Sequence, residues 1–268
     1  MFVHRDRLRT FKRARTKEIN QIFSCSIPFL SISMFLLAFL ILALTPTVTV
    51  FLPSDIETQQ ILVTSLCITI PLIIASAVLW GFFASRLIEI RNSHFTREAE
   101  FRLKLISILE RISNDKKVDP SPLLNQMKSL TKKLEVKDRN KLVWALISAL
   151  TGIAMFFLYY VLMNDMRVHE TKEFLFKDLL DGCFSRLGIR PLLFVRKDPI
   201  KTSSFPIFFI LVLVTFGLFS YYWTFIILRD FKSHILWHHR WEKIFLESLR
   251  RLSSDTYIQS LSRDFGGV

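Results

Sequence analysis

The sequence predicts an all-α membrane protein with four transmembrane helices, arranged as two parallel repeats that are each a helical hairpin running on into a cytoplasmic helix. The first observation behind this prediction is the distribution of charge, which leaves four long stretches without any Asp, Glu, Lys or Arg. About 20 mostly apolar residues are enough for a helix to cross a bilayer. The four stretches therefore predict membrane spans at about 24–45, 60–84, 142–163 and 205–228.

The second observation is an internal repeat. Aligning each residue with the one 140 positions later gives six identities within 23 positions, without a gap. The first copy carries Ser93, His94, Leu109, Arg111, Ser113 and Asp115, and the second carries Ser233, His234, Leu249, Arg251, Ser253 and Asp255. Such self-similarity indicates a duplicated unit, and it pairs the helix that follows the second span with the helix that follows the fourth.

The third observation is the asymmetry of Lys and Arg between the segments that flank the spans. Residues 1–24, 85–141 and 229–268 carry seven, fourteen and seven of these residues, whereas 46–59 carries none and 165–204 carries eight. Positively charged segments stay in the cytoplasm. If each span crosses once, 46–59 and 165–204 share a side with no net charge, whereas the other three segments together carry a net charge of +13. This difference places both termini and the central segment inside, and it places 165–204 outside.

These boundaries divide the chain into five predicted parts. They are a basic cytoplasmic arm at 1–22, a transmembrane hairpin at 23–84, a cytoplasmic helical hairpin at 85–141, a second transmembrane hairpin at 142–228 and a cytoplasmic helical tail at 229–268. Apolar residues recur at helical spacing between 171 and 187, which predicts an amphipathic helix in the external loop. No Gly or Pro occurs from Phe82 to Asp119, so we expect the second span to continue as a helix to about Ile112.

Part of the fourth span resembles a known family. Gly217 is followed by Tyr222-Trp223, then by Arg229-Asp230 and His234. This pattern resembles an uncharacterised family of small prokaryotic multi-pass membrane domains over about 40 residues of the chain. The resemblance implies a location in a prokaryotic cell membrane and no established activity.

One group of side chains could carry chemistry. His234, His238 and Glu242 follow one another at four-residue spacing and share a helix face, and the first copy of the repeat offers His94 and Glu98. If the two helices pack side by side, these five side chains could bind zinc or iron. Two other interpretations stay open, a structural His94/His234 pair and a set of solvated interface residues. We predict no catalytic residue and no cofactor.

Other residues are predicted to contact lipid or other helices. Basic and aromatic side chains at the inner membrane surface favour contact with anionic lipids, whereas small residues in the spans allow close helix packing. The lipid contacts are Arg9, Lys12, Arg13, Trp237, Arg240 and Trp241, and the packing positions are Ala77, Gly81, Ser148, Gly152 and Gly217. A nucleic-acid partner is not expected, because the basic residues form no recognisable binding module.

Three functions compete at this stage. The first is a non-enzymatic interaction or signalling scaffold that binds a protein partner, or a second copy of the chain, through its cytoplasmic helices. The alternative is an oligomeric channel lined by hydroxyl side chains, because the spans contain no ionisable residue that coupled transport would need. The third is a metal-dependent membrane enzyme that uses the histidine face.

Overall fold

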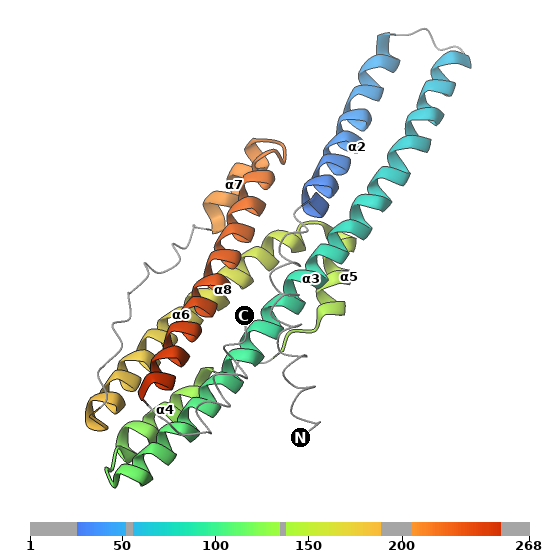
Figure 1. Ribbon diagram of the computed structural model, residues 1–268. Coiled ribbons are helices and arrows are strands. Elements are labelled where there is room, and N and C mark those ends of the chain that lie inside the picture. The colour runs from blue at the N-terminus through green and yellow to red at the C-terminus, as the bar shows by residue number, and fades with distance from the viewer. Residues whose placement is uncertain (1–25, 52–55, 135–137, 189–204, 253–268) are drawn as a thin grey trace, which may run out of the picture.

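The computed structural model describes residues 26–51, 56–134, 138–188 and 205–252, and every secondary-structure element in these ranges is a helix (Figure 1). The predicted all-α fold is therefore confirmed. In chain order the helices are α2 (Ser26–Phe51), α3 (Ile56–Lys116), α4 (Ser121–Leu134), α5 (Lys141–Thr151), α6 (Ala154–Arg186), α7 (Phe205–Val214) and α8 (Phe219–Leu252). The predicted basic arm, with Arg9, Lys12 and Arg13, and the tail beyond Leu252 lie outside the described residues.

Helix α3 is the longest element, and the other helices are arranged along it (Figure 1). It continues through 61 residues, or about 90 Å at the usual helical rise, so the predicted continuation of the second span beyond the apolar stretch is confirmed. Helix α2 returns along the N-terminal part of α3. Two reciprocal hydrogen bonds join them, because Ser31 Oγ donates to the carbonyl of Ser76, and Ser76 Oγ donates to that of Ser31, both at 3.0 Å.

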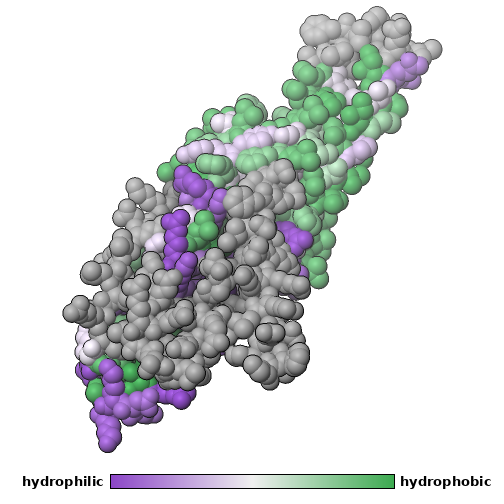
Figure 2. Space-filling view, viewed as in Figure 1, coloured by the Kyte–Doolittle hydropathy of each residue, from purple (hydrophilic) through white to green (hydrophobic). Residues whose placement is uncertain are grey.

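Two helices of the described chain are long and apolar enough to cross a membrane. One candidate span is Pro28–Thr45 within α2, and the other lies within Gln59–Lys116 of α3. Their large apolar side chains point outward, as in Phe35, Phe39 and Val78, which are 50%, 50% and 64% exposed. Figure 2 shows hydrophobic residues over most of the described surface at this end of the molecule. Lipid tails would cover such a surface, whereas a soluble protein rarely exposes an apolar patch of this size.

The predicted third span at 142–163 is not one helix. It divides into the short helix α5 and the start of α6, and Gly152 lies between them with a φ of 59°. The chain reverses there. Ala149 of α5 lies beside Gly81 of α3, whereas Arg139, which precedes α5, is bonded to Asn92 further along α3. Helix α5 thus runs antiparallel to α3, and α6 returns in the same direction as α3.

An ion-pair group closes the base of this α5–α6 hairpin. Asp165 of α6 accepts hydrogen bonds from Arg91 Nε at 2.8 Å and from Arg139 at 3.0 and 3.1 Å. Arg139 precedes the hairpin and Asp165 follows its apolar part, so the two ends of the apolar hairpin lie side by side. The pair could not form if residues 142–163 crossed a membrane as one helix.

The predicted fourth span at 205–228 is also a hairpin. Phe216 and Gly217 have φ values of 50° and 89°, and this left-handed turn separates α7 from α8. The ring of Phe208 packs against Phe219 at 5.1 Å between centroids, and Phe205 packs against Trp223 at 5.8 Å. These contacts require the two helices to run antiparallel. Helix α7 is only 10 residues long, so it spans about 15 Å.

The predicted external helix at about 171–187 is wrong in its location. These residues form the second half of α6, and their apolar side chains share one buried core with α3, α4 and α8. Phe176 and Phe184 are at most 1% exposed, and Cys183 Sγ contacts Met127 of α4 at 3.6 Å. The predicted apolar stripe is present, but it packs against α3, α4 and α8 rather than facing an outer membrane surface.

Replacing Asp181 on α6 should stabilise the protein at neutral pH. Burial and the neighbouring Asp178 raise the pKa of Asp181 to about 6, and its Oδ1 has no hydrogen-bond partner. The raised pKa means that the folded state binds the proton more tightly, so stability falls as the pH rises from about 4 to about 6. Because the side chain is partly exposed, we expect Asp181→Asn to add about 1 kcal/mol at pH 8 and almost nothing at pH 4. Thermal unfolding at both pH values measures this, and an equal gain at both would contradict it.

Gly81 marks the closest approach between α3 and α5. A Cβ atom there would lie 2.9 Å from the carbonyl oxygen of Ala145 and 3.1 Å from the Cβ of Ala149. We expect Gly81→Ala to destabilise the fold by about 1 kcal/mol, because overpacking of about 1–3 kcal/mol outweighs a helix-propensity gain of up to about 1 kcal/mol.

The matched control for this substitution is Gly182→Ala in α6, where an added Cβ meets only the end of the Leu123 side chain at 3.3 Å. That variant should be neutral or slightly stabilising. Chemical denaturation in detergent micelles measures both variants, and a stabilised Gly81→Ala protein would show that α3 and α5 do not pack this closely.

Candidate metal centre

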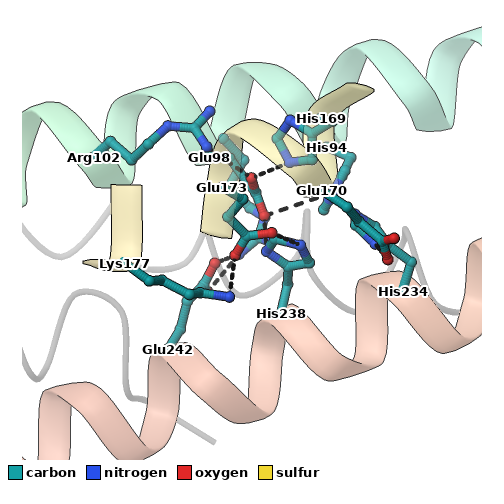
Figure 3. Close-up of polar contacts among 11 residues, drawn as sticks. His94, Glu98, Arg102, His169, Glu170, Glu173, Lys177, His234, His238 and Glu242 are labelled. Carbon is teal, nitrogen blue, oxygen red and sulfur yellow. Dashed lines mark hydrogen bonds and ion pairs between the residues drawn. The ribbon is translucent and has the colours of Figure 1, made fainter. Parts of the chain in front are cut away.

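Three helices converge just beyond the apolar part of the molecule, and each contributes two side chains four residues apart. Helix α3 provides His94 and Glu98, α6 provides His169 and Glu173, and α8 provides His234 and His238. Residues at this spacing lie on the same helix face. All three faces point to one interior region, in which these six side chains are at most 5% exposed (Figure 3).

The four histidines form a compact group. One ring nitrogen from each of His94, His169, His234 and His238 lies within 4.8 Å of the corresponding nitrogens of the others. Their ring centroids are 4.3 to 5.8 Å apart, and His94 meets the other three edge to face. Bonds from histidine to a transition metal are about 2.0–2.1 Å long. A single ion at the centre of the group would therefore be within reach after small side-chain rotations.

The carboxylate of Glu98 lies among three of these imidazoles (Figure 3). Its Oε2 is 2.6 Å from Nε2 of His169, and its Oε1 contacts Nδ1 of His238 and lies 3.7 Å from Nε2 of His94. Arg102, one helical turn further along α3, donates a hydrogen bond to Oε2 at 3.2 Å. Burial alone would raise the pKa of Glu98, but the surrounding His238, His169 and His94 lower it well below its usual value. Glu98 is therefore a carboxylate at neutral pH and a fifth possible ligand.

A second set of carboxylates orients the histidines from outside. Glu170 Oε1 is 3.0 Å from Nδ1 of His234. Burial and the neighbouring His238 lower the pKa of His234 to about 4, so this ring is neutral. A neutral imidazole whose Nδ1–H donates to a carboxylate presents the lone pair of Nε2 to the other side. Carboxylate, histidine and metal are joined in this order in many metalloproteins.

His238 is held by carboxylates on both nitrogens. Its Nε2 lies 2.8 Å from Glu173 Oε2, and its Nδ1 contacts Glu98. Burial lowers the pKa of His238, but Glu173 and Glu98 outweigh it and raise the pKa to about 9. Glu173 also forms an ion pair with Lys177, with 2.6 Å between Glu173 Oε1 and Lys177 Nζ. The same ammonium lies 3.6 Å from the ring centroid of Trp237. Without a metal, His238 is the imidazolium of the group.

His94 has a different environment. It is completely buried, and neither of its ring nitrogens has a hydrogen-bond partner among the described residues. Burial lowers its pKa well below the usual value, so the ring is neutral. Nε2 of His234 is likewise buried without a partner. Buried polar atoms without a partner cost free energy, and a metal ion would satisfy both of these lone pairs.

Four of the five candidate ligands predicted from the sequence meet in the structure, and the fifth does not. The structure brings together His94, Glu98, His234 and His238, as the side-by-side packing of the two long helices required. Glu242 does not join them. Its carboxylate accepts two hydrogen bonds from Arg97 Nη1 of α3, at 2.7 and 3.0 Å.

The contribution of α6 was missed altogether. His169, Glu170 and Glu173 were assigned to an external loop, on the opposite side of the membrane from the other ligands. A signal was nevertheless present, because His169, Glu173 and Lys177 follow one another at four-residue spacing, as the residues of α3 and α8 do.

The other predicted site residues are distributed differently from expectation. Arg240 is exposed, whereas Trp241 packs against the buried core and Trp237 covers Lys177, so the two tryptophans face the helical bundle. Among the packing positions, Gly81 contacts α5, Ala77 and Ser148 line a cavity, and Gly152 and Gly217 occupy the two turns.

Comparison with known proteins adds no relative. No family model matches the chain, and no curated protein and no solved structure is significantly similar to it. The resemblance of the fourth apolar stretch to a prokaryotic membrane family stays a prediction. Inference about function therefore rests on the geometry of the histidine group.

Proposed function

We propose that the protein is an integral membrane metalloprotein that holds one transition-metal ion where its membrane helices enter the cytoplasm. The observation that carries this proposal is the convergence of four buried histidines from three helices, with ligand nitrogens within 4.8 Å of one another. Imidazole with carboxylate is a donor set suited to zinc, iron, copper or nickel. His94, His169, His234 and His238 would hold the ion, with Glu98 as a further ligand.

The polar groups around the histidines suit a bound cation. Four buried carboxylates, those of Glu98, Glu170, Glu173 and Glu242, lie in or next to the group, and buried charges are tolerated when they are paired or coordinate a metal. A metal ion would also satisfy the ring nitrogens of His94 and Nε2 of His234, which have no hydrogen-bond partner among the described residues.

The arrangement of the hairpins supports a specific membrane topology. Helices α2 and α3 would cross the bilayer, and the α5–α6 and α7–α8 hairpins would enter it from one side and return. Residues 165–204 then lie on the same side as 85–141, so all 36 Lys and Arg of the chain are on that side. The segment 46–59, which joins the two candidate spans, contributes only Asp55 and Glu57 on the other side. Positive residues mark the cytoplasm, so we place both termini and the metal centre there.

This position defines what the ion would do. It would hold α3 together with α6 and α8. Helix α3 crosses the membrane, whereas α6 and α8 each continue from a hairpin that enters the membrane and returns, which we call a half-membrane hairpin. Every ligand is nearly inaccessible to solvent, which is typical of a resident ion rather than one that is passed on. We do not propose that a partner docks on α4, because Met127 and Leu130 of this helix are buried in the protein's own core.

The test is the metal content of protein purified in nanodiscs without chelators. Native mass spectrometry combined with elemental analysis should find one zinc, iron, copper or nickel ion per chain. Protein stripped with a chelator should then bind Co²⁺ or Zn²⁺ with one-to-one stoichiometry, and its melting temperature should rise. Protein that is metal-free as purified and takes up neither ion would overturn the proposal.

A further inference from the structure

A cavity of about 450 Å³ lies in the apolar half of the molecule, well away from the histidine group. Its walls come from α2, from α3, and from the α5–α6 and α7–α8 hairpins near their turns. The lining includes Ile32 and Phe35 of α2, Trp80 of α3, and Val212 and Leu213 of α7. The volume is within the range of ligand sites of about 300–1,000 Å³.

The two half-membrane hairpins create this space. Each reverses at a glycine with positive φ, Gly152 in one and Gly217 in the other. A Cβ atom on Gly217 would lie 3.1 Å from Leu36 Cδ2, so the second turn rests directly on α2. Because both hairpins turn back instead of continuing, the space that a full span would fill stays open.

One polar atom on the wall has no partner. Ser148 is fully buried, and its Oγ makes no hydrogen bond with any described residue. The other hydroxyls of the lining are occupied, because Ser220 Oγ donates to the carbonyl of Gly217, Thr151 Oγ1 donates to that of Ile147, and Ser76 Oγ is paired with Ser31. The cavity thus offers one hydrogen-bonding group within an otherwise apolar wall.

These walls select the chemistry of an occupant. Water is disfavoured, since a buried water needs two to four polar partners. Apolar side chains that face an empty space lose the dispersion contacts that a hydrocarbon chain would supply. Ser148 follows Lys141, the first residue of α5, by seven residues, or about 10 Å along the helix. In the proposed topology this distance places Ser148 inside the membrane, where a charged headgroup would be expensive to bury.

We propose that the cavity binds one uncharged long-chain lipid, whose single hydroxyl or carbonyl oxygen forms a hydrogen bond with Ser148. Its hydrocarbon chain fills the space between α2, α3 and the two turns. This inference rests on the membrane topology of the proposed function but not on the metal centre.

The experiment uses nanodisc-embedded protein and 9,10-dibromooctadecanol, whose bromine atoms quench the fluorescence of nearby tryptophan. Quenching of Trp80 should saturate at one molecule per chain, and Trp80→Phe should remove the saturable part. Ser148→Ala should weaken binding about fivefold, which is the effect of one hydrogen bond of about 1 kcal/mol. Ala77→Leu, which fills the cavity, should abolish saturable quenching.

Three results would overturn the inference. They are quenching that rises without saturation, saturable quenching that Ala77→Leu and Ser148→Ala both leave unchanged, and equal saturable binding of a dibrominated phosphatidylcholine. Metal content measured on the same samples separates the two proposals, since Ser148→Ala should keep its metal. Absence of quenching by either brominated lipid would instead contradict the membrane topology.

Discussion

The double substitution His94→Ala/His234→Ala should produce a protein that purifies with less than a tenth of the metal of the unmodified chain. It removes two of the imidazoles whose buried nitrogens have no hydrogen-bond partner among the described residues, and it leaves only two members of the group of four histidines. Elemental analysis of the nanodisc sample measures the loss. Added Zn²⁺ should no longer raise the melting temperature, whereas it should raise that of the unmodified apoprotein.

His239→Ala is the matched control for this variant. His239 is buried on the same helix, next to His238, but it does not belong to the group of four. It should retain one ion per chain.

Glu170→Gln tests the outer carboxylates, and the loss of such a partner should weaken metal affinity by about 10- to 100-fold. Full metal occupancy in the double variant would show that the ion is bound elsewhere.

The substitution Arg97→Met should destabilise the protein by about 3–5 kcal/mol, because it leaves the buried carboxylate of Glu242 without its partner. Arg97 on α3 and Glu242 on α8 are 7% and 5% exposed, and two hydrogen bonds connect them. The pair links the two long helices directly beyond the histidine group. Chemical denaturation in micelles measures the free energy of unfolding.

The double variant Arg97→Met/Glu242→Leu distinguishes a broken ion pair from a general packing defect. Replacing both partners by apolar residues removes the unpaired charge, so most of the lost stability should return. The double-mutant cycle gives the coupling energy of the pair. If Arg97→Met alone changes stability by less than about 0.5 kcal/mol, as surface substitutions do, the carboxylate is not held in a buried pair.

Much of the histidine group could be predicted because helical periodicity is a local property. His94 and Glu98, like His234 and His238, are four residues apart, so each pair shares a helix face whatever the tertiary structure. The alignment of the two repeats then suggested that both faces meet. The assignment of Glu242 failed for a nonlocal reason, because Arg97 of the other helix was close enough to bind its carboxylate.

The topology could not be predicted from hydropathy. An apolar stretch of 22 residues, such as 142–163, is long enough for one crossing or for two short helices that reverse within the membrane. Gly152 and Gly217 were visible in the sequence, but glycine is compatible with helix packing as well as with a left-handed turn. Treating each stretch as one crossing separated residues 165–188 from the helices α3 and α4, although α6 shares a buried core with both, and it separated His169 from the other histidines.

The sequence by itself determined that the chain is helical, that α3 continues far beyond its apolar part, and which side chains share a helix face, because all three follow from local spacing and composition. Only the tertiary structure decided that α6 completes the histidine group and that two apolar stretches turn back on themselves. Those outcomes depend on contacts between distant residues, such as Arg139 with Asp165 and Phe208 with Phe219, which composition and periodicity do not encode.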